Sequence, residues 1–184
     1  MTTAAVVLAA GLARRLPGKL RVPFRGRPLV QWALGAAADA GLDDLFVVVG
    51  PDGLDDLLPD GARAVVNPRA AEGQATSLAA GLAAVDAAGH DAVVVGLADQ
   101  PFVPVEAWRL VAGAPAEALV VAATFAGERR PPVRLHRSVW PLLPSVGDEG
   151  ARVLLRSRPD LVVEVPCPGD PTDIDTPEDL ERWS

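Results

Sequence analysis

A short loop near the start of the chain concentrates groups that could bind phosphate. Residues 11–19 read GLARRLPGK and contain two arginines, Arg14 and Arg15, together with Lys19. Lys19 is the only lysine among 17 basic residues, which indicates a position with a specific need for that side chain. Exposed backbone N–H groups and three cations are suited to a polyphosphate. A solvated basic loop is the alternative interpretation.

Two common phosphate-binding motifs do not fit this loop. A dinucleotide fingerprint requires G-x-G-x-x-G, and Ala13 stands where the second glycine belongs. A P-loop also requires glycine at Ala13, and it requires a hydroxyl where Leu20 stands. These mismatches make a nicotinamide cofactor a weak interpretation, and they exclude the P-loop.

Two acidic segments lie far apart in the sequence and could hold a cation together. Asp99 ends an apolar stretch in the segment GLADQP, and Asp173 and Asp175 alternate in the segment DIDTP. Asp99 could instead serve only to form a turn, because aspartate is common at the ends of strands. Thr176 can cap a following helix, but capping does not explain Asp175. Magnesium beside a nucleotide phosphate needs one or two protein carboxylates, which Asp99 and Asp175 could supply.

The single asparagine of the sequence opens a third candidate segment. Asn67 begins a loop that contains Gly73 and leads into a predicted helix at Thr76 and Ser77. The two hydroxyls could simply cap that helix. The asparagine, the glycine and the hydroxyls could also recognise a base edge or a ribose.

Length and composition limit the possible classes of protein. The chain has 184 residues, of which 49% are hydrophobic and 22% charged, typical of one globular domain spanning residues 1–184. A formal net charge of −7 argues against nucleic acid or an acidic membrane as a partner. The lone Cys167 cannot form an internal disulfide, and the first residues resemble neither a signal peptide nor a membrane span. We therefore expect a cytoplasmic protein.

Apolar segments alternate with helical patterns along much of the chain. Uninterrupted valine-rich runs are typical of strands buried on both faces, and crossover-length helices between them require parallel pairing. The sequence therefore predicts a three-layer α/β fold with a mostly parallel, Rossmann-like sheet. The expected strands are residues 4–10, 45–49, 62–66, 91–97, 118–125, 133–135 and 161–165; the expected helices are 28–40, 54–58, 74–88, 105–111, 138–142, 149–156 and one beginning at Pro177; a polar turn is expected at 126–130.

The order of these motifs resembles a known family. Together they resemble the MobA-like NTP transferases, which are nucleotidyltransferases of the glycosyltransferase-A architecture, and especially the molybdenum cofactor cytidylyltransferase branch. The motifs are LAAG at 8–11 with Arg15 and Lys19, GRPL at 26–29, NP at 67–68, Gly73 with SL at 77–78 and GL at 81–82, LADQP at 97–101, GDEGAR at 147–152 and DIDTP at 173–177.

The resemblance implies a reaction and the residues that perform it. It implies transfer of CMP from CTP to a phosphorylated pterin-type acceptor, molybdopterin or the molybdenum cofactor, with Mg²⁺ as cofactor and pyrophosphate as product. LAAG, rather than LAGG, looks like the cytidine-using branch, GDEGAR looks like its pterin-side element, and a molybdoenzyme maturation partner is implied. The implied catalytic residues are Arg15, Lys19 and Asp99; the implied metal ligands are Asp99 and Asp175; the implied nucleotide-binding residues are Leu8, Ala9, Ala10, Gly11, Asn67, Gly73 and Ser77.

The chain departs from the family pattern at two places. The loop is one residue shorter than usual between Arg15 and Lys19, with Pro17 where glycine is common. Residues 130–132 read Arg-Pro-Pro where the family usually has Gly-His-Pro. The phosphate geometry and the acceptor are the features that these differences affect.

Three other functions are compatible with the same motifs. One is an NAD(P)H-dependent oxidoreductase of the nicotine blue reductase type, which resembles this branch. Another is a sugar-nucleotide glycosyltransferase, suggested by the alternating aspartates, and the third is a carrier for a pterin cofactor without turnover. Arg129, Arg130 and Arg134 could contact an anionic acceptor, or they could form a solvated face.

Overall fold

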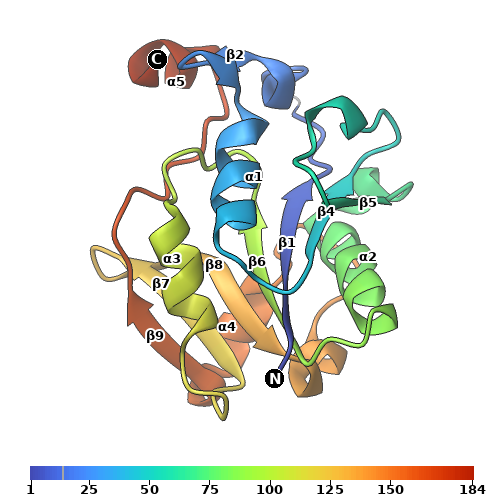
Figure 1. Ribbon diagram of the computed structural model, residues 1–184, viewed down its shortest axis with the longest axis vertical. Coiled ribbons are helices and arrows are strands. Elements are labelled where there is room, and N and C mark those ends of the chain that lie inside the picture. Colours follow the sequence, from blue (N-terminus) through green and yellow to red (C-terminus); the bar gives the residue numbers. More distant parts are fainter. Residues whose placement is uncertain (14) are drawn as a thin grey trace.

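Seven strands form the central sheet, in the order β5-β4-β1-β6-β8-β7-β9 (Figure 1). The computed structural model describes residues 1–13 and 15–184. Neighbouring strands are parallel except where β8 pairs with β6 and β7. The mostly parallel sheet that the sequence predicts is therefore confirmed. Its strands are β1 (Thr3–Ala9), β4 (Leu45–Val49), β5 (Arg63–Val66), β6 (Ala92–Leu97), β7 (Val120–Phe125), β8 (Glu128–His136) and β9 (Val162–Pro166).

Helices cover both faces of the sheet, which gives the three predicted layers. On one face Val7 of β1 packs in a cluster with Leu34 of α1 and Trp108 of α3, the two helices in front of the sheet in Figure 1. On the other face Val6 packs in a second cluster with Leu78 of α2. Side chains alternate between faces along a strand, so the apolar run of β1 supplies both cores. The helices are α1 (Val30–Asp39), α2 (Gln74–Ala87), α3 (Val105–Ala112), α4 (Arg152–Ser157) and α5 (Pro177–Trp183).

A two-stranded ribbon follows the glycine-rich loop and is absent from the sequence prediction. β2 (Pro23–Phe24) and β3 (Arg27–Pro28) pair antiparallel through a turn at Arg25 and Gly26, whose φ angles are 47° and 88°. Two successive left-handed residues form the tight turn that suits a hairpin. Pro28, expected in the first turn of a helix, therefore lies in β3, and α1 begins only at Val30.

Several other boundaries differ from the prediction. Ala126 and Gly127 have φ angles of 49° and 85° and complete the turn alone, so β8 already begins at Glu128. The helices expected at 54–58 and 138–142 are 3₁₀ segments, and Pro141 in the second removes a backbone donor. The fourth helix begins at Arg152, three residues later than expected. The 3₁₀ segments are η1 (Lys19–Arg21), η2 (Asp55–Leu57), η3 (Ala70–Glu72), η4 (Arg137–Leu142) and η5 (Pro159–Leu161).

Arg134 has a structural role inside the protein. Its side chain is fully buried, and its guanidinium donates to the carbonyl oxygens of Ala112, Ala114, Pro115 and Ala118, at 2.6 to 3.1 Å. These carbonyls lie around the end of α3, where backbone acceptors lack helical partners. The hypothesis that Arg134 contacts an anionic acceptor is therefore wrong, because all of this donor capacity faces the interior.

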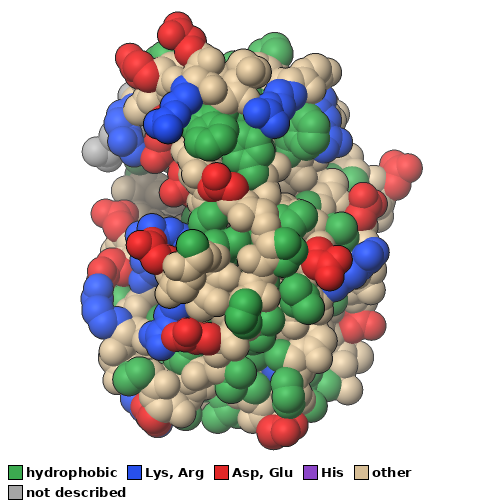
Figure 2. Space-filling view, turned by 90° about the vertical axis from the view of Figure 1, so that its left-hand side faces the viewer, with side chains coloured by type: hydrophobic (Ala, Val, Ile, Leu, Met, Phe, Trp, Pro, Cys, Tyr) green, Lys and Arg blue, Asp and Glu red, His purple; other side chains and the backbone are tan. Residues whose placement is uncertain are grey.

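Acidic and basic side chains are interspersed on the face shown in Figure 2. Opposite charges form ion pairs in the protein, such as Arg129 of β8 with Glu164 of β9 at 2.6 Å. This face carries no broad basic surface of the kind that binds a nucleic-acid backbone. In the part of the chain that the structure describes, no helix combines the length and apolarity needed to cross a membrane.

Candidate active site

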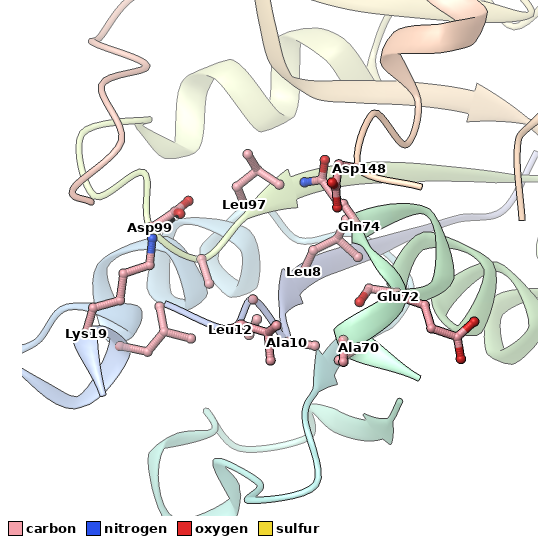
Figure 3. Close-up of a pocket in the computed structure, with 16 residues that line it drawn as sticks. Leu8, Ala10, Leu12, Lys19, Ala70, Glu72, Gln74, Leu97, Asp99 and Asp148 are labelled. Carbon is pink, nitrogen blue, oxygen red and sulfur yellow. Dashed lines mark hydrogen bonds and ion pairs between the residues drawn. The ribbon is translucent and has the colours of Figure 1, made fainter. Parts of the chain in front are cut away.

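A cavity of about 440 Å³ opens where β1 and β6 end (Figure 3). The two strands pair in parallel, with Leu8 beside Leu97, so the loops that follow them emerge at the same edge of the sheet. Lys19 and Asp99 lie at one end of the cavity, and Gln74 at the start of α2 lies at the other. This is the edge at which open α/β sheets bind ligands.

The ammonium group of Lys19 lies between two carboxylates. Its Nζ atom donates to Asp99 Oδ2 at 2.6 Å and to Asp175 Oδ1 at 2.7 Å, and only 8% of the side chain is exposed. Burial by itself disfavours the charged amine. The negative charge of Asp99 and the hydrogen bonds that Lys19 donates to both aspartates outweigh that effect and raise the pKa of Lys19. Lys19 is therefore a fixed cation.

The second predicted cation of the loop lies at the surface. Arg15 donates to Asp175 Oδ2 at 2.7 Å, but 69% of its side chain is exposed. An exposed pair of this kind is weak and exchangeable, so the guanidinium can turn to another anion. Arg14 lies outside the described residues.

Backbone and side-chain bonds join the two acidic segments. The amide of Ile174 donates to the carbonyl oxygen of Asp99 at 2.9 Å. Gln100, only 2% exposed, donates through Nε2 to the carbonyl oxygen of Pro171 at 3.0 Å and to Asp173 Oδ1 at 2.8 Å. These bonds hold the C-terminal segment against the loop after β6. The convergence of Asp99 and Asp175 thus depends on Gln100. From the sequence, this residue is recognised only as part of the LADQP motif.

The start of α5 fixes the backbone of Asp175. Thr176 caps the helix as predicted, because its hydroxyl accepts from the amide of Asp179 at 3.2 Å. In return Asp179 Oδ2 accepts from the amides of Asp175 and Thr176, at 3.0 and 2.9 Å. The bond from the Asp175 amide is the largest of the effects that lower the pKa of Asp179. The hydrogen bonds that cap α5 therefore also position Asp175 in the site. The sequence alone did not predict this connection.

Asp173 and Asp175 have different partners. Asp175 accepts from Lys19 and Arg15, whereas Asp173 accepts from Gln100. Burial, followed by the nearby charge of Asp99, raises the pKa of Asp173.

The other end of the cavity contains the segment around α2. Ser77 lines the cavity, whereas Asn67 lies behind it, 3% exposed, and donates to the hydroxyls of Thr76 and Ser77. Leu8, Ala9, Ala10 and Gly11 also line the cavity. Of the residues predicted to bind nucleotide, Asn67 and Gly73 are thus placed behind the lining.

Gly73 has a steric role. Its φ angle is 112°, and a Cβ atom there would lie 2.5 Å from the backbone of Gly147 and 2.7 Å from Asp148 Oδ1. The amide of Ala75 donates to the carbonyl oxygen of Gly147 at 2.8 Å. Only glycine permits this contact, which places Asp148, and the GDEGAR segment around it, at the cavity wall.

A narrow slot adjoins the cavity. It shares Leu8, Gln74 and Leu97 with the cavity, and its other side is formed by β8 and α4. Its walls are mainly apolar, and three arginines lie along it. The remaining lining residues are Leu78, Val95, Arg129, Arg130, Pro131, Val133, Glu149, Gly150, Ala151, Arg152 and Leu155.

The architecture and this edge of the sheet define a class of protein. A mostly parallel α/β sheet, with a lysine-bearing loop after its first strand and carboxylates at the same end, has its ligand site where open α/β sheets bind nucleotides. The chain belongs to the MobA-like NTP transferase family, whose domain profile matches residues 5–162. It is therefore a nucleotidyltransferase.

Named relatives and solved structures resemble the chain over nearly its whole length. Purine catabolism protein PucB of Bacillus subtilis (strain 168) is 31% identical, over 96% of this chain and 93% of PucB. Nicotine blue oxidoreductase of Paenarthrobacter nicotinovorans is 31% identical, over 96% of this chain and 94% of that protein. The crystal structure of Rv0371c from Mycobacterium tuberculosis H37Rv has a TM-score of 0.84 at 28% identity, covering 99% of this chain and 97% of Rv0371c. The same protein has been solved with manganese, with a TM-score of 0.83.

Replacing Asp173 with asparagine should stabilise the protein at neutral pH. Because the pKa of Asp173 is raised in the folded state, its ionisation opposes folding. The stability that protonated Asp173 contributes is complete below about pH 3.9 and is lost as the pH rises through the folded-state pKa. Asp173→Asn keeps an acceptor for Gln100 without the charge. Thermal unfolding should show a melting temperature a few degrees above wild type at pH 7, and a difference that vanishes toward pH 3.9.

The control for this prediction is Asp52→Asn. Asp52 is exposed and forms no ion pair within residues 1–13 and 15–184. Its replacement should leave the stability profile unchanged. Parallel profiles for wild type and Asp173→Asn would contradict the assignment of Asp173.

Proposed function

We propose that this protein transfers CMP from CTP to a phosphorylated, pterin-type acceptor such as molybdopterin, with magnesium, and releases pyrophosphate. One observation carries the proposal: the only lysine of the chain and two carboxylates from distant segments meet at one end of a cavity at the carboxyl edge of the sheet. The phosphates of a nucleoside triphosphate fit that end. The nucleoside then lies toward α2.

The residues at the two ends suit the two parts of CTP. Lys19 and Arg15 neutralise phosphate oxygens, and Arg15 is able to exchange its exposed aspartate partner for a phosphate. The backbone of Ala9 and Ala10 lies along the cavity between the two ends, and the hydroxyl of Ser77 lies near the start of α2. The LAAG form of this segment supports cytidine as the nucleoside.

Asp99 and Asp175 fit a magnesium ion. One oxygen of each carboxylate faces a single point, the Nζ atom of Lys19. Two protein carboxylates are enough for Mg²⁺, because this ion retains water and phosphate ligands. When bound, the ion supplies positive charge to the phosphate oxygens. The manganese complex of the similar mycobacterial protein supports a divalent ion.

The proposed reaction is an in-line displacement. A phosphate oxygen of the acceptor forms a bond to the α-phosphorus of CTP while the bond to the bridging oxygen of pyrophosphate breaks. The electron pair leaves with pyrophosphate, so no covalent enzyme intermediate is needed. Lys19 and Arg15 hold the phosphates in position and offset the charge that grows on their oxygens.

We place the acceptor in the apolar slot. Because the slot shares three residues with the cavity, a molecule bound there reaches the α-phosphate. The apolar walls, which include Val133 and Leu155, suit the flat body of a pterin. At the rim Arg152 is exposed, and its guanidinium donates no hydrogen bond within the described residues, so it is available to a phosphate.

Lys19→Ala should depress turnover far more than nucleotide affinity. The lysine meets charge that increases in the transition state, so we expect kcat to fall about 10²- to 10³-fold. Arg21→Ala, two residues away and paired at the surface with Asp56, is the matched control. Pyrophosphate release from CTP and molybdopterin measures the effect. Turnover of Lys19→Ala within twofold of wild type would exclude this role.

Arg152→Ala should weaken the acceptor and spare CTP. Because alanine cannot donate to the acceptor's phosphate, we expect the KM for molybdopterin to rise about tenfold while the KM for CTP is unchanged. Arg158→Ala is the control, because Arg158 is bound to Asp160 outside the slot. Equal changes in both KM values would place the acceptor elsewhere.

A second candidate, an NAD(P)H-dependent oxidoreductase, is favoured by the 31% identity to nicotine blue oxidoreductase. The glycine-rich loop lacks the dinucleotide fingerprint, which weighs against it. A thermal-shift series with CTP, GTP, UTP, ATP and NADPH, with and without Mg²⁺, separates the two. We expect stabilisation by CTP with Mg²⁺, whereas stabilisation by NADPH alone would favour the oxidoreductase.

A further inference from the structure

A buried hydroxyl lies at the cavity wall, with no acceptor for its proton in the part of the chain that the structure describes. Ser77 is 5% exposed, lines the cavity and accepts from Asn67 Nδ2 at 3.0 Å. Within residues 1–13 and 15–184, no group accepts a hydrogen bond from Ser77 Oγ. Buried polar groups are nearly always satisfied, so an unused donor at a cavity wall points to a ligand.

The orientation of Asn67 is fixed by the backbone. Its Oδ1 atom accepts from the amide of Arg69 at 2.9 Å. A backbone amide can only donate, so the oxygen and nitrogen of the side chain cannot be interchanged. Nδ2 must therefore direct its two protons at Thr76 Oγ1, at 2.9 Å, and Ser77 Oγ, at 3.0 Å.

Thr76 completes the chain of donors. Its hydroxyl has carbonyl acceptors at Arg69, 2.9 Å away, and at Gly73, 2.8 Å away. Thr76 therefore uses its own proton on the backbone and a lone pair for Asn67. The partners of Asn67 are therefore consistent with one arrangement of hydrogen bonds. In it, the Ser77 hydroxyl accepts a hydrogen bond from Asn67 and can donate its own proton to a ligand in the cavity.

We infer that Asn67 is a positioning residue that makes Ser77 a hydrogen-bond donor toward the base, and thereby sets the base preference of the site. The pocket then accepts a base that presents a carbonyl oxygen or unprotonated ring nitrogen at this point, as the O2 and N3 edge of cytosine does, and rejects an amino group there. This inference rests on the proposed function, which places the nucleoside at this end of the cavity.

Asn67→Asp tests the polarity with almost no change in shape. The carboxylate still accepts from the Arg69 amide, but it also accepts the Ser77 proton, which leaves a lone pair facing the cavity. We expect the Kd for CTP to rise about tenfold or more, because a donor is replaced by a repelling acceptor. Ser77→Ala should also weaken CTP, and adding Asn67→Asp to Ser77→Ala should cost nothing further, since both act through one hydroxyl.

Inorganic tripolyphosphate separates base recognition from phosphate binding. The ratio of the Kd for CTP to the Kd for tripolyphosphate, measured by calorimetry with Mg²⁺, should rise in Asn67→Asp and in Ser77→Ala. Gln31→Glu, which makes the same amide-to-acid change outside the cavity, should leave the ratio at its wild-type value. Equal weakening of both ligands by Asn67→Asp would mean a purely structural asparagine and would overturn the inference.

Failure of the inference differs from failure of the proposed function. Wild-type protein that binds neither ligand contradicts the proposed function. If wild-type protein binds CTP and tripolyphosphate, and the variants bind CTP as tightly as wild type does, only the role of Asn67 and Ser77 is contradicted. Should Asn67→Asp fail to fold, Ser77→Ala alone decides: selective loss of CTP supports the donor, and unchanged affinity for CTP overturns it.

Discussion

The ion cluster around Lys19 is the constraint on which the rest of the site depends. Two carboxylates brought to one point repel each other, and each loses part of its hydration there. A buried ammonium 2.6 and 2.7 Å from their oxygens compensates both costs, and a buried ammonium without them would be equally unfavourable. The three groups are therefore stable only together. The loop after β1, the loop after β6 and the C-terminal segment must all reach the same place.

The fold supplies that convergence through adjacency and through a return of the chain. Pairing of β1 with β6 makes their following loops neighbours, although the strands are far apart in sequence. The C-terminal segment comes back across the loop after β6, where the Ile174 amide is bound to Asp99 and the Ile174 side chain is buried with Phe24 and Leu29. The ribbon of β2 and β3 thus supports the site, because Phe24 of β2 and the adjoining Leu29 pack against the segment that carries Asp175.

Much of this arrangement could be predicted from the sequence, and the limits have physical causes. β1, β4 and β6 are continuous apolar runs, so their burial in a parallel sheet can be predicted from local composition. β2 and β3 have two residues each and depend on the left-handed conformation of Arg25. Local composition does not predict this conformation at an arginine. Asp99 and Asp175 could be paired through resemblance, but Gln100 and Asp179 support them through contacts that exist only after folding. The burial of Asn67 behind Ser77 likewise depends on hydrogen bonds to the start of α2 that exist only after folding.

The charge balance of the cluster bears on how an acidic protein could bind a polyanion. Among the described residues, Lys19 and Arg15 face the three carboxylates of Asp99, Asp173 and Asp175, so this end of the cavity has no excess of positive charge. A triphosphate therefore gains little from these five side chains alone. In the proposed function Asp99 and Asp175 would hold a divalent cation, which would supply additional positive charge beside Lys19 and Arg15 at this end of the cavity. Metal and nucleotide would then bind cooperatively, because each removes the electrostatic obstacle to the other.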